Sequence, residues 1–160
     1  MEEYMKRAVA LAEEAAAEGE VPVGAVIVQR KTGRIVGEGR NMRESAGNAL
    51  AHAEIMAIDQ ACRTLGGWRL PDCAMYVTLE PCPMCCGAII NARIDQVIFG
   101  AYDSKSGSAV SVQRMFDLPY NYRPELFGGV MEQECAALLS DFFRRLRLRG
   151  KKYRKSGTVE

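Results

Sequence analysis

Two cysteines at a predicted helix start are the residues best suited to chemistry. Cys82 and Cys85 are separated by Pro83 and Met84 and follow an apolar stretch at 74–79. Pro83 suits the first position of a helix, which predicts Cys82 at the N-cap and Cys85 one turn later, with both sulfurs facing the same way. The free N–H groups and positive dipole of a helix start lower the pKa of a thiol and favour the thiolate that binds a metal. The pair is therefore predicted to form half of a metal site.

A histidine and a glutamate elsewhere in the chain complete this site. His52 is the only histidine of the sequence and lies two residues before Glu54. With Cys82 and Cys85 it gives three protein ligands, the number that a catalytic zinc ion keeps while one position stays open for water. Two thiolates and a neutral imidazole reduce the charge of Zn²⁺ to zero, so its water is acidified less and needs a nearby base. Glu54 would point about 200° away from His52 on a helix, which predicts a proton shuttle rather than a ligand.

Two other interpretations use the same cysteines. A Cys-x-x-Cys pair can also be a redox dithiol or half of a structural zinc site. The fourth ligand of a structural site would come from the remaining cysteines, which are Cys62, Cys73, Cys86 and Cys135. Cys86 would project about 100° away from Cys85 on a helix, and the others lie in apolar contexts where cysteine packs as a small hydrophobe. Glu54 distinguishes the interpretations, because a structural site has no use for it.

The segments around these residues indicate an α/β fold in which helices cover a sheet. Helices are predicted over 2–18, 51–65, 83–91 and 132–148, and strands over 21–28, 34–40, 74–79 and 95–100. Alternation of strand and helix in the middle of the chain predicts a three-layer α/β/α sandwich. The stretch from 100 to 128 is expected to be irregular, and loops of that length are usually functional or disordered.

Composition places the chain among ordinary globular proteins. Its 160 residues are 48% apolar and 26% charged, which predicts a single domain over 1–160. Its apolar runs are too short for a membrane span, and the acidic start at Met1–Glu3 does not look like a secretory signal. Six cysteines in a domain of this size do not suggest a disulfide framework, so a reducing compartment, the cytoplasm, is expected.

The end of the chain is strongly basic. Eight positive charges and no acid lie between residues 144 and 155, although the formal net charge of the whole chain is only +1. We expect a basic helix end and tail over about 144–160. Such a block suits phosphate binding, and the alternative is a solvated helix end that binds nothing.

His-x-Glu followed by Pro-Cys-x-x-Cys after a strand is the signature of the zinc nucleobase deaminases. At these residues the sequence resembles the cytidine deaminase-like superfamily and, within it, the bacterial tRNA-specific adenosine deaminases. The likeness covers nearly the whole chain, and the stretches 99–103 and 134–143 mark the tRNA enzymes more narrowly than the zinc motif does. The resemblance implies a mixed five-stranded sheet, one Zn²⁺ per subunit and a homodimer. It also implies deamination of the wobble adenosine in a tRNA anticodon stem-loop to inosine.

The resemblance also assigns roles to single residues. His52, Cys82 and Cys85 match the zinc ligands of the family, and Glu54 matches its proton shuttle. Asn41 matches the residue that holds the purine edge. The base pocket is expected to be lined by Pro22, Ala53 and Pro81, with the backbone N–H of Cys82 donating to the substrate ring. Apart from these carried-over roles, the stretch 100–128 and the basic end of the chain are expected to supply the RNA contacts, which are Asp103, Lys105, Tyr120, Tyr122, Arg123, Arg144, Arg145 and Arg147.

The sequence departs from the family pattern in three places. Asn48-Ala49-Leu50 stand where the family usually has Asp-Pro-Thr, Tyr102 stands where Arg is common, and Tyr122 replaces a frequent His. All three lie in or near stretches that could meet RNA. Two other functions therefore stay open: deamination of a free purine or pyrimidine base or nucleoside, such as guanine, and a non-catalytic RNA-binding module with structural zinc.

Overall fold

Five strands form one mixed sheet in the computed structural model, which describes the backbone of residues 1–155 and the side chains of residues 1–150. Their order across the sheet is β2-β1-β3-β4-β5. The strand β1 (Gly24–Gln29) is antiparallel to both of its neighbours, β2 (Arg34–Arg40) and β3 (Cys73–Leu79). The strands β3, β4 (Gln96–Ala101) and β5 (Glu125–Phe127) run parallel. The predicted mixed five-stranded sheet is confirmed.

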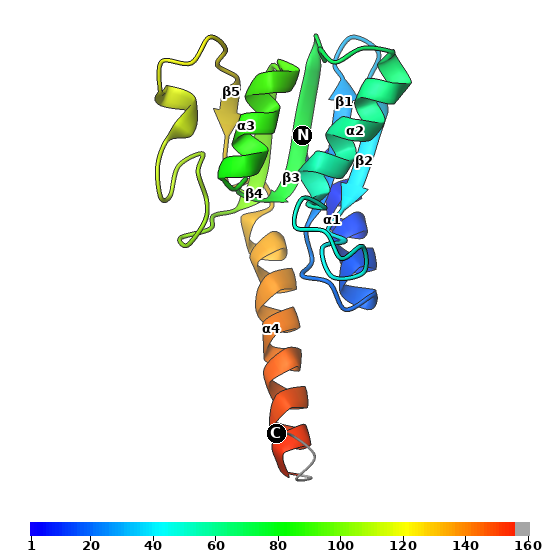
Figure 1. Ribbon diagram of the computed structural model, residues 1–160, viewed down its shortest axis with the longest axis vertical. Coiled ribbons are helices and arrows are strands. Elements are labelled where there is room, and N and C mark those ends of the chain that lie inside the picture. The colour runs from blue at the N-terminus through cyan, green and yellow to red at the C-terminus, as the bar shows by residue number, and fades with distance from the viewer. Residues whose placement is uncertain (156–160) are drawn as a thin grey trace.

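Helices cover both faces of this sheet, as Figure 1 shows, and confirm the predicted three-layer sandwich. One face carries α2 (Ala53–Leu65) and α3 (Pro83–Ala92). The other carries α1 (Glu2–Ala17) and the first turns of α4 (Glu132–Lys155). No helix within residues 1–155 is long and apolar enough to cross a membrane.

Alternation along β1 divides the interior into two cores. Ala25 and Ile27 pack under α2 and α3, whereas Val26 and Val28 pack under α1. All four side chains are at most 3% exposed, as expected for a strand covered on both faces. Helix α2 lies directly against β2 because the latter has glycine at position 39, where a Cβ would overlap with the carbonyl oxygen of Ala53. This close packing fixes the start of α2, where the candidate ligand His52 is found.

The structure corrects two expectations about the second half of the chain. The stretch 100–128 is not irregular throughout, since it contains a short 3₁₀ helix, η1 (Met115–Asp117), and the edge strand β5. The last helix does not end near Leu148 but continues to Lys155, because arginine and lysine are good helix formers. Figure 1 shows this helix extending far beyond the sheet. Residues 156–160 of the expected basic tail lie outside the described residues.

Candidate functional site

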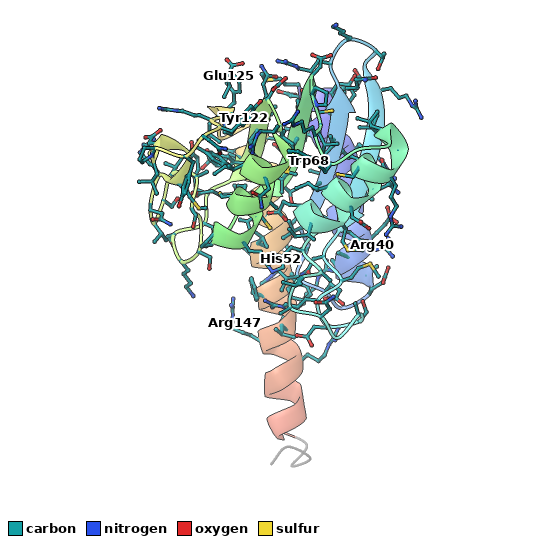
Figure 2. All side chains as sticks on the ribbon, turned by 45° about the horizontal axis from the view of Figure 1, so that its top comes forward. Arg40, His52, Trp68, Tyr122, Glu125 and Arg147 are labelled. Carbon is teal, nitrogen blue, oxygen red and sulfur yellow. The ribbon has the colours of Figure 1, made fainter. Side chains whose placement is uncertain are left out.

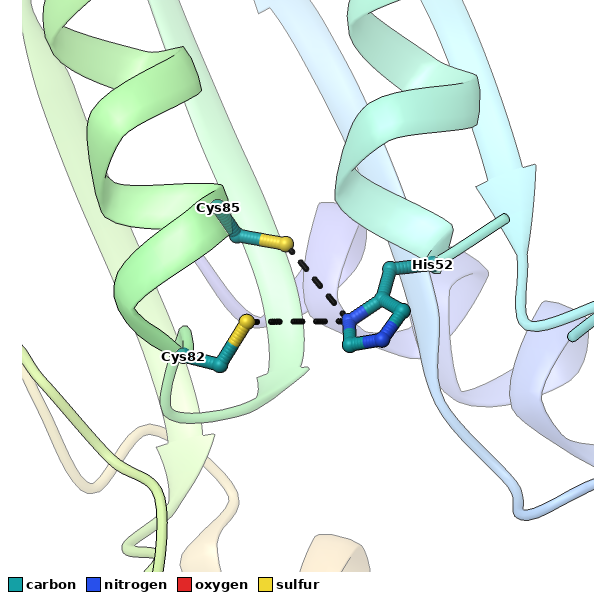
Figure 3. A group of neighbouring side chains, drawn as sticks. All are labelled: His52, Cys82 and Cys85. Atoms are coloured by element: carbon teal, nitrogen blue, oxygen red, sulfur yellow. Dashed lines mark hydrogen bonds between the residues drawn. The ribbon is translucent and has the colours of Figure 1, made fainter. Parts of the chain in front are cut away.

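The candidate ligands lie at the starts of two neighbouring helices. His52 is the N-cap of α2 and Cys82 is the N-cap of α3, both with extended backbone. Pro83 occupies the first turn of α3 and Cys85 follows in the same turn. Figure 3 shows the imidazole of His52 facing the two sulfurs across the gap between the helices. The predicted N-cap and first-turn positions of the two cysteines are thus confirmed.

The distances between these side chains fit a tetrahedral zinc ion. The Sγ atoms of Cys82 and Cys85 each lie 3.7 Å from Nδ1 of His52, and all three ligand atoms are within 4.8 Å of one another. Zinc bonds of about 2.3 Å to sulfur and 2.1 Å to nitrogen place the two ligand atoms about 3.6 Å apart in a tetrahedron. The three residues are therefore positioned to bind one zinc ion.

The fourth position of such an ion has no protein ligand among the described residues. No further His, Cys, Asp or Glu within that part of the chain joins the group. Cys86 is fully buried, and its thiol donates a hydrogen bond to the carbonyl oxygen of Pro81 at 3.7 Å. It packs in the core beneath α3 and is not one of the grouped ligands, in agreement with the predicted separation of about 100° from Cys85. Three ligands and an open position are typical of catalytic rather than structural zinc.

The electrostatics of the site favour a thiolate. The pKa of the Cys82 thiol falls to about 4 because the S–H of Cys85 donates to it, and His52 also hydrogen-bonds to it. Cys85, as the donor of that bond and a buried group, has a raised pKa. The contact with Cys82 raises the pKa of the His52 imidazole. Cys82 thus carries the charge that a zinc ligand needs.

Glu54 lies beside the ligands and is not one of them. It belongs to the first turn of α2, its side chain is 4% exposed, and it lines the same pocket as His52 and Cys82. Burial, together with the negative charge of Cys82, raises the pKa of its carboxyl group to about 7. A buried carboxyl group that can hold or release a proton near neutral pH is suited to acid–base catalysis.

A pocket opens over the metal site. Its volume is about 180 Å³, far more than the roughly 10–15 Å³ that a single water needs, so a ring-sized group can enter. The predicted residues Asn41 and Ala53 line it. Pro22 and Pro81 are buried next to lining residues and do not themselves line it. The pocket therefore contains the metal ligands, the acid–base candidate and a polar amide.

The amide of Asn41 is held in one orientation. It is 8% exposed; its Nδ2 donates to the carbonyl oxygen of Val21 at 3.1 Å, and its Oδ1 accepts from the N–H of Arg43 at 3.0 Å. An amide has two donor hydrogens and two acceptor lone pairs. Each end therefore keeps one bonding direction for a ligand in the pocket.

Three polar residues of the pocket were not predicted from the sequence. Arg43, Glu80 and Ser106 all line the pocket. Arg43 follows Asn41 closely and Glu80 precedes Cys82 by two positions, so proximity to the motif was the available signal. Ser106 had no such signal, because it lies in the stretch expected to be irregular.

Five of the residues predicted to contact RNA lie at the end of the sheet that carries the pocket. Asp103 lines the pocket itself, and its Oδ1 accepts from the N–H of Lys105, whose side chain is exposed. Arg144, Arg145 and Arg147 are exposed on α4, where it projects from this end of the sheet (Figure 2).

The other three lie between η1 and β5. Tyr120 is 52% exposed. The hydroxyl of Tyr122 donates to Asp95. Asp95 directly precedes β4, whereas Cys82 follows the parallel strand β3. Tyr122 and Cys82 therefore lie at opposite ends of these strands. Figure 2 accordingly shows Tyr122 well away from His52. Arg123 forms a 2.7 Å ion pair with Asp117.

Enzymes that deaminate nucleobases combine this ligand set and open position with a buried glutamate beside the metal. The class is thus a zinc-dependent deaminase with a cytidine deaminase-like fold. Residues 1–147 match the family model of the MafB19-like deaminases, and the chain belongs to this family.

The chain is also similar to individual proteins and solved structures within this class of deaminases. The tRNA-specific adenosine deaminase of Bacillus subtilis (strain 168) is 45% identical over 154 residues, which are 96% of this chain and 94% of that protein. A solved structure from studies of A-to-I editing by tRNA:A34 deaminases at the wobble position of transfer RNA is 40% identical, with a TM-score of 0.83, and covers 87% of this chain and 100% of that chain. A guanine deaminase structure from Bacillus subtilis is also 40% identical, but with a TM-score of 0.61 over 79% of this chain and 82% of that chain.

Proposed function

We propose that this protein is a tRNA-specific adenosine deaminase that converts the wobble adenosine, the first base of a tRNA anticodon, to inosine. The observation that carries the proposal is the metal-ligand group. The Sγ atoms of Cys82 and Cys85 each lie 3.7 Å from Nδ1 of His52, and Glu54 is buried beside them in the same pocket. Similarity over almost the full length to a tRNA-specific adenosine deaminase supports the choice of substrate.

The reaction replaces the amino group on C6 of the adenine ring by oxygen from water and releases ammonia. His52, Cys82 and Cys85 would hold one Zn²⁺, which when bound makes water a nucleophile near neutral pH. Glu54 accepts one proton from the water and delivers it to the ring nitrogen. It then carries the second proton, from the new hydroxyl on C6, to the amino group, which departs as ammonia. Its burial keeps bulk water from competing for that proton.

Two further groups orient the base. Asn41 holds the purine edge with the donor and acceptor directions that its own backbone contacts leave over, and Ala53 offers a small surface against the ring. The backbone N–H of Cys82 donates to the ring at the start of α3, where helix N–H groups lack partners within the helix. Pro22 and Pro81 support this wall of the pocket from the adjacent backbone.

The tRNA is bound as a single-stranded loop whose target base is extruded into the pocket. Arg144, Arg145 and Arg147 attract the phosphates of the anticodon stem from the projecting part of α4. Asp103 and Lys105 meet the nucleotides next to the target base. The proposed contacts farther out are Tyr120, Tyr122 and Arg123. Of the two tyrosines, Tyr120 is the exposed one, and its ring can stack on an unpaired base.

The proposal includes a single-domain subunit over 1–160, a homodimer, and action in the cytoplasm, where tRNA is processed. Sedimentation equilibrium of the zinc-loaded protein checks the dimer: we expect twice the chain mass of 17.6 kDa. A mass of one chain at micromolar concentration would exclude it.

Guanine deamination is the second candidate, because the guanine deaminase structure is as identical in sequence as the tRNA deaminase structure. The two candidates differ in product. Zinc-loaded protein is incubated separately with a tRNA pool and with free guanine, adenosine and cytosine, and the products are measured by mass spectrometry. We expect inosine in tRNA and no xanthine, whereas xanthine with unmodified tRNA would identify a guanine deaminase. A non-catalytic RNA-binding module would give no product at all and would leave buried Glu54 without a role.

A further inference from the structure

Glu80 has contacts that the zinc chemistry does not require. It is 2% exposed and lies between β3 and the ligand Cys82. Its carboxylate oxygens accept four hydrogen bonds, all from the loop that follows β4. The donors are the N–H of Asp103 at 3.1 Å, of Val110 at 2.7 Å and of Ser111 at 2.8 Å, and the hydroxyl of Ser111 at 2.5 Å.

Four donors occupy the bonding capacity of this carboxylate. An ionised carboxylate has about four lone-pair sites, and each oxygen of Glu80 receives two bonds. Although Glu80 borders the pocket, no direction is left over for a substrate, a metal or a transferred proton. Its function must therefore act through the loop that it binds.

The loop is also packed on Glu80. Gly107 is buried, and a Cβ at this position would overlap with Cδ and Oε1 of Glu80 and crowd the carbonyl oxygen of Asp103. The N–H of Ser108 donates to the carbonyl oxygen of Pro81 at 2.8 Å. The loop is thus joined to both Glu80 and Pro81, the two residues that directly precede Cys82.

This attachment determines where two pocket residues lie. Asp103 and Ser106 belong to the loop and line the pocket. Oδ1 of Asp103 accepts from the N–H of Ser106 at 3.2 Å, so the two residues form one hydrogen-bonded unit of the loop. Loss of the Glu80 contacts would release this unit and leave the metal ligands in place.

We propose that Glu80 is a positioning residue for substrate: it fixes the loop 103–111 at the pocket mouth so that Asp103 and Ser106 meet the nucleotides beside the target base. The identity of that substrate rests on the proposed function. The attachment of the loop to Glu80 does not depend on that function, and hydrogen exchange tests it independently.

A second buried carboxylate provides a matched control. Glu20 is 1% exposed and accepts from the N–H of Glu44 at 3.0 Å and of Ser45 at 2.6 Å. It therefore anchors a different loop, the one that carries Arg43. Both loops lie at the end of the sheet where α2 and α3 begin (Figure 1).

Glu80→Gln keeps the shape of the side chain and removes one acceptor. Each oxygen of Glu80 binds a backbone N–H, so either orientation of the new amide places its NH₂ group against such a donor. We expect KM for tRNA to rise roughly tenfold or more, with kcat within about threefold and zinc still at one per chain, because a contact common to the ground and transition states is lost. Gly107→Ala leaves the carboxylate intact but forces the loop away from it, and is expected to raise KM in the same way.

Hydrogen exchange tests the positioning without reference to activity. In the zinc-loaded protein, Glu80→Gln should speed amide exchange in peptides over 102–112 and leave 42–46 unchanged, whereas Glu20→Gln should do the opposite. Unchanged exchange at 102–112 with unchanged KM in both Glu80→Gln and Gly107→Ala would overturn the proposal. A hundredfold fall in kcat at constant KM, or loss of zinc, would also overturn it by placing Glu80 in the chemistry or at the metal. If the unmodified protein does not deaminate tRNA, the proposed function fails, and the exchange data alone decide whether Glu80 holds the loop.

Discussion

Replacing Glu54 by glutamine separates proton transfer from metal binding. Glu54 is 4% exposed, so water cannot take its place, and glutamine has nearly the same shape. Because Glu54 is outside the ligand group, the Glu54→Gln protein should still bind one zinc per chain. A positioned acid–base group contributes about 10²- to 10⁴-fold to rate, which corresponds to a barrier increase of about 2.7–5.4 kcal/mol.

Single-turnover deamination of a tRNA, with zinc measured on the same sample, is the appropriate assay. We expect a rate at least about 100-fold lower, unchanged zinc and unchanged tRNA affinity. His52→Ala is the matched control, since it removes a ligand and should lose zinc together with activity. A Glu54→Gln rate within about tenfold of the unmodified enzyme would be too small a loss for a proton shuttle. Loss of zinc from Glu54→Gln would instead make Glu54 a ligand.

Three further changes test other parts of the structure. Deleting residues 144–160 should weaken tRNA binding and flatten its salt dependence, because each lost phosphate contact lowers the slope of log K against log salt by about 0.7–0.9. If the truncated and unmodified proteins bind tRNA with the same affinity at every salt concentration, the basic helix end has no role in binding. Asn41→Ala should reduce kcat/KM for tRNA by roughly 10- to 100-fold, in keeping with one or two lost hydrogen bonds to the base, while zinc stays at one per chain. An unchanged kcat/KM would show that other residues hold the base. Burial raises the pKa of Glu20, but the N–H groups of Ser45 and Glu44 outweigh this and hold it below its ordinary value. Glu20 therefore stabilises the fold above the unfolded-state pKa of a glutamate and loses this effect as pH falls through its lower folded pKa. In urea titrations between pH 7 and pH 3, Glu20→Gln should accordingly lose less stability than the unmodified protein, and parallel curves would contradict this.

Local patterns made much of the fold and of the metal site predictable. Pro83 indicates a helix start by its fixed φ and missing N–H, and this placed Cys82 at the N-cap. The apolar run at 21–28 indicated the strand that the structure shows as β1. The strand β5 was missed because its three residues are too few for an alternation of buried and exposed positions to be recognised.

Contacts between distant loops were not predictable in the same way. Glu80 binds Val110 and Ser111, which lie 30 and 31 residues later in a stretch without periodicity. Tyr122 was expected at an RNA contact on the basis of its type and position, and nothing in the sequence showed that its hydroxyl binds Asp95. Such contacts depend on how the loops fold back over the sheet, which residue types alone do not determine.

The position of the product in RNA tests the central claim most directly. Two anticodon stem-loop transcripts are prepared, one with adenosine at the wobble position and one with that adenosine exchanged for guanosine and a new adenosine placed one nucleotide further on. Inosine is then mapped by nucleotide in each after incubation with the zinc-loaded protein. We expect inosine at the wobble position of the first transcript and none in the second. Inosine at the displaced adenosine, or in neither transcript, would contradict the proposed wobble deaminase.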